Sequence, residues 1–197
     1  MMDRTLYTVS GFMRTGTSMM MRALEAGGME ACYRQSRDEM KSRYADEHYN
    51  PNDGGLYELE PQDYRRWGFP QSYEGKLIKA LTMGVPRMAV MEHGIRVVFM
   101  RRDVEEIRQS YLAFFDHELQ NIEHLERNMA DIIQRIGNRK DVLSLDVFWY
   151  RQVVEQPLRH FELLESHGWP VDVAASVAVV DPQCCRFRLE NLTVGII

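Results

Sequence analysis

The stretch TLYTVSGFMRTGTSMMMRALEAGG (residues 5–28) decides the fold of this 197-residue chain. Its first six residues (5–10) form an apolar, β-branched run that predicts a buried strand, and the segment that begins at Thr17 predicts a helix. Gly11 and Gly16 bound the loop between them. A strand, a glycine-bounded loop and a helix in this order are typical of an α/β domain.

The rest of the chain repeats this alternation of short apolar runs and longer amphipathic segments. Further strands are expected at residues 29–33, 75–81, 95–101 and 141–147. Helices are expected at 86–94, at 103–137 with one break near Asp116, and at 148–168, where Pro157 should bend or divide the helix. We therefore predict an α/β fold of three layers, in which helices flank a central parallel sheet of about five strands. The length suits one core, so residues 1–197 are expected to form a single domain.

Composition narrows the class of protein. The net charge of -5 argues against a nucleic-acid binder that neutralises many phosphates. No run approaches the roughly 18 apolar residues of a membrane span, and the first residues lack a signal-peptide core, so we expect a cytoplasmic protein with no membrane partner. Cys32, Cys184 and Cys185 have neither an even count nor CxxC spacing, which predicts neither a disulfide framework nor a zinc site.

The loop SGFMRTGTSMM (10–20) nearly matches the nucleotide-binding pattern GxxxxGK[ST]. Gly11, Gly16 and Ser18 are in register, but Thr17 stands where the pattern has the lysine that reaches the β- and γ-phosphates. Amides at a helix N-terminus stabilise a bound phosphate through their donors and through the helix dipole. The loop therefore either cradles a phosphate on a ligand without a γ-phosphate, or is a strand-to-helix turn that binds nothing.

A second segment, RDVEEIRQSY (102–111), places Arg102 at a strand end and Ser110 about two helical turns further on. With the loop GFMRTGTS (11–18) it resembles the PAPS-dependent sulfotransferases. That family binds the 5′-phosphosulfate of 3′-phosphoadenosine 5′-phosphosulfate (PAPS) with a loop like G-[FY]-P-[KR]-[ST]-G-[TS]-[TS]. It binds the 3′-phosphate with an R-[DN]-P-x-[DE]-x-x-x-S segment.

The resemblance implies a sulfotransferase of the P-loop fold, similar to small bacterial or phage members. Such an enzyme moves a sulfuryl group in line from PAPS to a hydroxyl or amine, requires no metal and releases adenosine 3′,5′-bisphosphate. The donor-binding residues that it implies are Gly11, Arg14, Thr15, Gly16, Thr17, Ser18, Arg102 and Ser110. The two charged ends of the donor predict two pockets for anions, one around Arg14 and one around Arg102. Met13 and Val104 stand where the family often has proline, which changes backbone rigidity rather than a ligand contact.

Two cations are candidates for the transferred group. Arg14 would neutralise charge on the bridging oxygen. Lys79 resembles the strand-end lysine of the family, while Lys76 competes for this role and a solvated strand-end lysine is the alternative interpretation.

The general base is harder to place, because Leu81 stands where cytosolic members have a histidine. The stretch NPNDGGLYELE (50–60) resembles the N-P-x-G-[FY]-[WFY]-E segment of many bacterial members, which makes Glu58 the candidate base. Glu60 could serve instead, or Glu58 could bind the acceptor without moving a proton.

Two other functional classes remain open. A small P-loop kinase would use the run VLSLD, whose Asp146 imitates the metal-binding aspartate of such enzymes, but the missing lysine at Thr17 argues against it. A nucleotide-binding module without catalysis is the second. The acceptor is expected to be a small molecule or a carbohydrate, and a homodimer is left open.

Overall fold

The computed structural model describes residues 4–32, 59, 63, 68–90 and 92–181. Its four strands are β1 (Thr5–Gly11), β2 (Leu77–Lys79), β3 (Gly94–Arg101) and β4 (Val142–Trp149). They form one parallel sheet in the order β2-β1-β3-β4. The α/β prediction is confirmed. The described residues supply four strands rather than about five, because the expected strand at 29–33 contributes a single bridge between Ala31 and Leu77.

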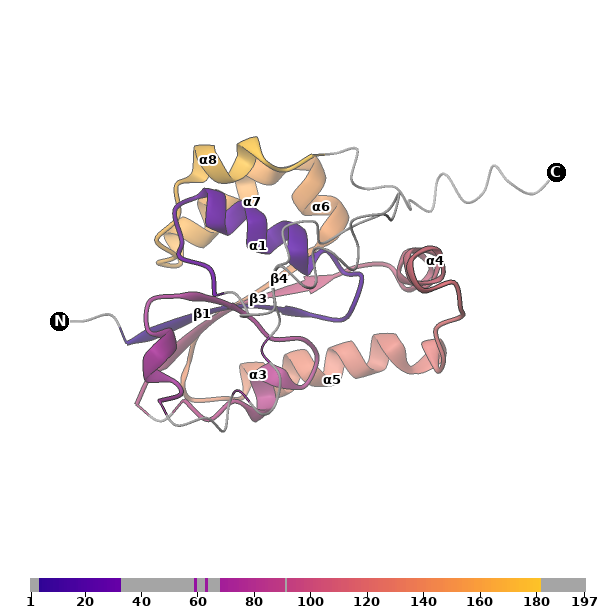
Figure 1. The fold of residues 1–197 in the computed structure, drawn as a ribbon, viewed down its shortest axis with the longest axis horizontal. Helices are drawn as coiled ribbons and strands as arrows, with labels where there is room; N and C mark the ends of the chain where they lie inside the picture. The colour runs from indigo at the N-terminus through magenta and orange to yellow at the C-terminus, as the bar shows by residue number, and fades with distance from the viewer. Residues whose placement is uncertain (1–3, 33–58, 60–62, 64–67, 91, 182–197) are drawn as a thin grey trace.

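Helices cover both faces of the sheet, as predicted (Figure 1). The first face carries α1 (Thr17–Ala26), α6 (Tyr150–Glu155), α7 (Pro157–Ser166) and α8 (Val173–Ala178). The second face carries α3 (Gly84–Arg87) and α5 (Leu125–Gly137). The helix α4 (Val104–Phe115) and the single turns η2 (Gln71–Tyr73) and η3 (Ile122–His124) complete the described elements.

Two predicted interruptions are present. Asp116 has a φ of 55° and ends α4, which breaks the long helical segment where expected. Pro157 divides the later segment, because α6 ends before it and α7 begins on it, and proline suits the first position of a helix. The short crossover helix was predicted too late in the chain. It begins at Gly84, since Pro86 is tolerated in a first turn, and the backbone is extended at Met88.

The core has two parts, one on each face of the sheet. Tyr7 and Val9 of β1 pack with α1 and the α6–α8 helices, while Leu6 packs with the α3 and α5 side. All seven residues of β1 are buried, as expected for a central strand of a parallel sheet. Parallel strands end at a common edge, so the loops after β1, β2 and β3 emerge close together.

None of the helices among the described residues has both the length and the apolar character that a membrane crossing requires.

Candidate functional site

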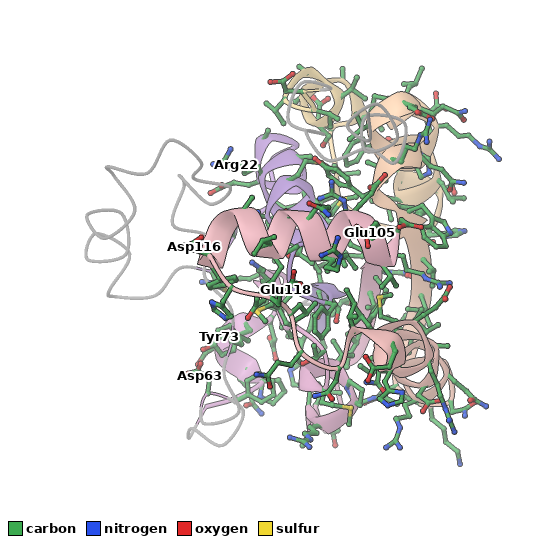
Figure 2. The ribbon with its side chains drawn as sticks, turned by 90° about the vertical axis from the view of Figure 1, so that its right-hand side faces the viewer. Arg22, Asp63, Tyr73, Glu105, Asp116 and Glu118 are labelled. Atoms are coloured by element: carbon green, nitrogen blue, oxygen red, sulfur yellow. The ribbon has the colours of Figure 1, made fainter. Side chains whose placement is uncertain are left out.

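The candidate site lies at the carboxyl ends of β1, β2 and β3. Figure 2 looks onto this end of the sheet, where α4 passes in front from the side of Glu105 to Asp116, with α1 behind it. The loop from β1 to α1, the last residue of β2 and the turn from β3 to α4 meet there.

The loop conformation depends on its two glycines. A Cβ on Gly11 would lie 2.7 Å from the carbonyl oxygen of Met100, and one on Gly16 would lie 2.2 Å from Cδ2 of Tyr150. Gly16 also has a φ of 92°, a backbone conformation that glycine adopts without strain. The hydroxyl of Thr15 donates to the carbonyl of Phe12 at 2.8 Å, so it stabilises the loop from within.

Arg14 joins the two segments that the sequence analysis had singled out. Its Nε and Nη2 donate to Oγ of Ser110 at 3.1 and 2.9 Å, across 96 residues of sequence. Its backbone has a φ of 70°, which is uncommon outside glycine and is found most often where the surrounding structure imposes it, as at functional sites. The loop therefore presents a guanidinium group to the middle of α4.

Arg102 holds the backbone of the glycine loop at Arg14. Its side chain is 6% exposed, its Nη1 donates to the carbonyl oxygen of Arg14 at 3.3 Å, and its Nε donates to Glu106 at 3.0 Å. Asp103 caps α4 by accepting from the amides of Glu105 and Glu106. The two arginines around which anion pockets are predicted are thus neighbours. Direct contact between Arg102 and a phosphate stays a prediction.

Lys79 points to the first turn of α1. Its Nζ donates to Oγ of Ser18 at 3.2 Å, and the side chain is buried. Lys76 instead pairs with Glu30 at 2.7 Å, and the hydrogen bond to Glu30 raises the pKa of Lys76. Of the two lysines considered for the transferred group, Lys79 is therefore the one beside the glycine loop.

The N-terminus of α1 completes the group of donors. The helix begins at Thr17, and Gly16 at the N-cap has no side chain that could accept from the first amides. These amides and the positive end of the helix dipole suit an anion. Thr17 is buried, and Ser18, which contacts Lys79, is half-buried.

The candidate general bases and the candidate metal-binding aspartate are not part of this group of donors. Glu58 and Glu60 lie outside the described residues. Asp146 pairs in register with Val98, three residues before the end of β3, and accepts from Nδ1 of His167 at 2.6 Å. The aspartate thus ties the end of α7 to the sheet and does not face the glycine loop. Among the residues described, no three His, Cys, Asp or Glu side chains gather where they could hold a metal ion.

Tyr150 belongs to the buried core on the α1 side of the sheet and also contacts the candidate site. Its ring lies 4.8 Å from the guanidinium carbon of Arg102 and fills the space beside Gly16. Its position immediately after Trp149, the last residue of β4, was the available signal, because strand ends meet at this edge.

Comparison with known proteins adds little to this geometry. The sequence matches no family model and no curated protein. Among solved structures, it is similar to a retinol dehydratase bound to androsterone and the inactive cofactor PAP, with a TM-score of 0.46 and 13% identity over 94% of this chain. The chain spans 65% of the length of that protein. A sugar kinase from Janibacter sp. HTCC2649 gives a TM-score of 0.43 and 14% identity, over 89% of this chain and 97% of the kinase. At these TM-scores the function must be argued from the site.

Proposed function

We propose that the protein transfers a sulfuryl group from PAPS to a hydroxyl or amine on a small molecule or carbohydrate. The observation that carries the proposal is the contact between the Arg14 guanidinium and the Ser110 hydroxyl. It joins a glycine loop at a helix N-terminus to the second segment of the sulfotransferase pattern. One nucleotide with a 5′-phosphosulfate and a 3′-phosphate could therefore span both segments.

The donor chemistry of the loop suits a phosphosulfate. The first amides of α1 would donate hydrogen bonds to the 5′-phosphate. The cationic groups of Arg14 and Lys79 lie beside the same loop, at Ser110 and Ser18. These cations would stabilise negative charge on the oxygen that bridges phosphorus and sulfur as the bond to sulfur breaks.

The proposed reaction proceeds in line. The acceptor oxygen or nitrogen forms a bond to sulfur, and the bond between sulfur and the bridging oxygen breaks. Adenosine 3′,5′-bisphosphate leaves with the electron pair, and the carboxylate of Glu58 takes the proton of the acceptor. The role of Glu58 rests on the sequence resemblance alone.

Calorimetry with two nucleotides tests the proposal. We expect adenosine 3′,5′-bisphosphate to bind in the presence of a chelator, because the anion site uses amides and cationic side chains. ATP with magnesium should bind more weakly, since Thr17 replaces the lysine that holds a γ-phosphate. Binding of ATP that requires magnesium, without binding of the bisphosphate, would identify a phosphotransferase instead.

The catalytic part needs a second measurement. With labelled PAPS and a panel of hydroxyl and amine acceptors, the wild type should form a sulfated product, and Glu58→Gln should lower turnover while it leaves the affinity for the bisphosphate nearly unchanged. Equal turnover in the variant would remove Glu58 from the role of base. Tight bisphosphate binding with no product from any acceptor would favour a nucleotide-binding module.

A further inference from the structure

The turn between β2 and α3 contains a strained residue. Thr82 has a φ of 46°, and Met83, which follows it, has a φ of -79°. The amide of Gly84 donates to the carbonyl oxygen of Leu81 at 2.9 Å, which closes a four-residue turn around these two residues. A positive φ followed by a negative φ is the pattern of a type II′ turn, whose first central residue is usually glycine. Thr82 therefore stands where a β-branched side chain costs conformational energy.

This turn is fixed to the start of the glycine loop. The amide of Thr82 donates to the carbonyl oxygen of Gly11 at 2.9 Å. From there the chain enters α3, on the face of the sheet opposite α1 (Figure 1). Glycine would adopt the same backbone conformation without strain, so the geometry of the turn does not explain why a threonine side chain is present.

The hydroxyl of Thr82 is available for a ligand. The residue is half-buried, and among the residues that the structure describes its hydroxyl has no hydrogen-bond partner. Other hydroxyls of the loop do have partners, since Thr15 donates to Phe12 and Ser18 accepts from Lys79. Strained backbone is found mostly at ligand sites, where it holds a side chain in a fixed place. We therefore looked for the ligand group that this hydroxyl would meet.

The position of Thr82 in the sheet suits the acceptor rather than the donor. The strand order is β2-β1-β3-β4 and Arg102 follows β3, so the proposed donor would extend from the glycine loop across the end of β3. The end of β2 lies on the other side of β1. There Leu59, which stands between the two candidate bases in the sequence, donates its amide to the carbonyl oxygen of Lys79 at 2.8 Å. In-line transfer requires the acceptor opposite the leaving group, which is the β2 side.

We propose that the Thr82 hydroxyl binds the acceptor, a contact that presupposes the proposed sulfuryl transfer and narrows its substrate class. The reacting hydroxyl or amine has to give its proton to the base, so Thr82 would bind a second polar group on the neighbouring carbon. A hydroxyl can donate to or accept from such a group, and no proton moves to Thr82. Vicinal diols and amino alcohols, which include sugars, would therefore be preferred to acceptors with one isolated hydroxyl. Because the turn is already rigid, little conformational freedom is lost when the contact forms.

Steady-state kinetics with labelled PAPS and two matched probes test the proposal. The probes are 1,2-cyclohexanediol and cyclohexanol, which differ by one hydroxyl. The wild type should have a kcat/KM for the diol about 3–10-fold above that for cyclohexanol, counted per reacting hydroxyl, as one hydrogen bond would give. Thr82→Val should lose this preference through a higher KM for the diol, and Thr82→Ser should restore it. Ser166→Ala is the matched control and should keep the preference, since this hydroxyl donates to Leu163 at the end of α7.

Two further measurements separate this contact from support of the glycine loop. Thr82→Val should bind adenosine 3′,5′-bisphosphate as the wild type does, because the donor lies on the other side of β1. Thr82→Gly should raise the midpoint of thermal unfolding, since it relieves the strained φ, and should still lose the preference for the diol.

Three results would overturn the proposal: an unchanged preference in Thr82→Val, a loss of bisphosphate affinity equal to the loss in kcat/KM, or no sulfated product from either probe with the wild type. Binding of the bisphosphate by the wild type without metal reports separately on the proposed function. If it is present, the donor site stands and only the role of Thr82 is refuted. If it is absent, the proposed function itself is refuted.

Discussion

The two ends of the parallel sheet hold their arginines in different ways. At the amino end, Arg139 forms two hydrogen bonds with the carboxylate of Asp141 and also donates to backbone carbonyls in and beside α3. At the carboxyl end, Arg14 and Lys79 donate to serine hydroxyls. Arg139 thus braces the start of β4 against α3, whereas Arg14 and Lys79 are held beside the glycine loop. We therefore expect the cation at the amino end to serve the fold and the cations at the carboxyl end to serve a ligand.

Arg102 combines a role in the fold with a place at the candidate site. It lies at the carboxyl end of the sheet and forms an ion pair with Glu106, and both side chains are almost completely buried. Its further bond to the carbonyl of Arg14 ties the fold to the loop. The comparison therefore predicts that substitution of Arg102 lowers both the stability of the fold and the affinity for the nucleotide. Substitution of Arg14 should lower mainly the affinity, and substitution of Asp141 should lower only the stability.

The largest effect is expected for Arg102→Met. The substitution leaves Glu106 buried without its guanidinium partner, so the free energy of unfolding should fall by about 3–5 kcal/mol in urea denaturation. The double variant Arg102→Met with Glu106→Met should recover most of this loss, because a buried ion pair can be replaced by apolar side chains at little cost. If the recovered double variant still binds adenosine 3′,5′-bisphosphate like the wild type, Arg102 does not contact the phosphate.

The second effect separates binding from stability. Arg14→Gln should weaken binding of adenosine 3′,5′-bisphosphate by about 10–100-fold, which corresponds to a lost charge-assisted hydrogen bond of about 1.5–3 kcal/mol. Its free energy of unfolding should fall by less than that of Arg102→Met, because Arg14 is only half-buried. Arg139→Gln is the matched control and should show the reverse, with lower stability and unchanged affinity. Equal losses of affinity in both variants, measured by calorimetry, would contradict the contrast between the two ends.

The smallest effect concerns pH. Hydrogen bonds from Arg139 hold the pKa of Asp141 below its ordinary value of 3.8. The folded state thus binds this proton less readily than the unfolded state, so the stabilisation is present above about pH 4 and is lost as the pH falls through the lowered pKa. Asp141→Asn should cost about 1 kcal/mol of unfolding free energy at neutral pH. The difference from the wild type should shrink in denaturation curves recorded at progressively lower pH, and a constant difference would show that the carboxylate charge is not its source.

Local patterns account for the parts of the fold that the sequence predicted well. The segment from β1 to α1 was predictable because its apolar run, its glycines and its helix all lie within 24 residues. The break at Asp116 and the division at Pro157 also follow from local backbone preferences. The position of α3 and the presence of α8 were not predicted, since short helices depend on the surfaces against which they pack.

In the candidate site, too, local motifs predicted the residue types but not their contacts. Short motifs indicated that Arg14 and Ser110 concern one ligand, but they could not show that the two side chains touch. The choice of Lys79 over Lys76 required the register of β2 against β1, which places Val9 beside Lys79. The contact between Tyr150 and Arg102 is visible only in the structure, because an aromatic residue at a strand end looks like any core residue in a linear pattern.

By itself, the sequence determined the class of fold, the glycine loop and the residue types that could bind an anion, since each of these depends on neighbours along the chain. The tertiary structure decided which cations approach the loop and which brace other parts of the fold. It also placed Asp146 under α7 and away from the site. The reason is geometric: the role of a charged side chain depends on the atoms within a few ångströms of it, and in a parallel sheet those atoms come from segments far apart in the sequence.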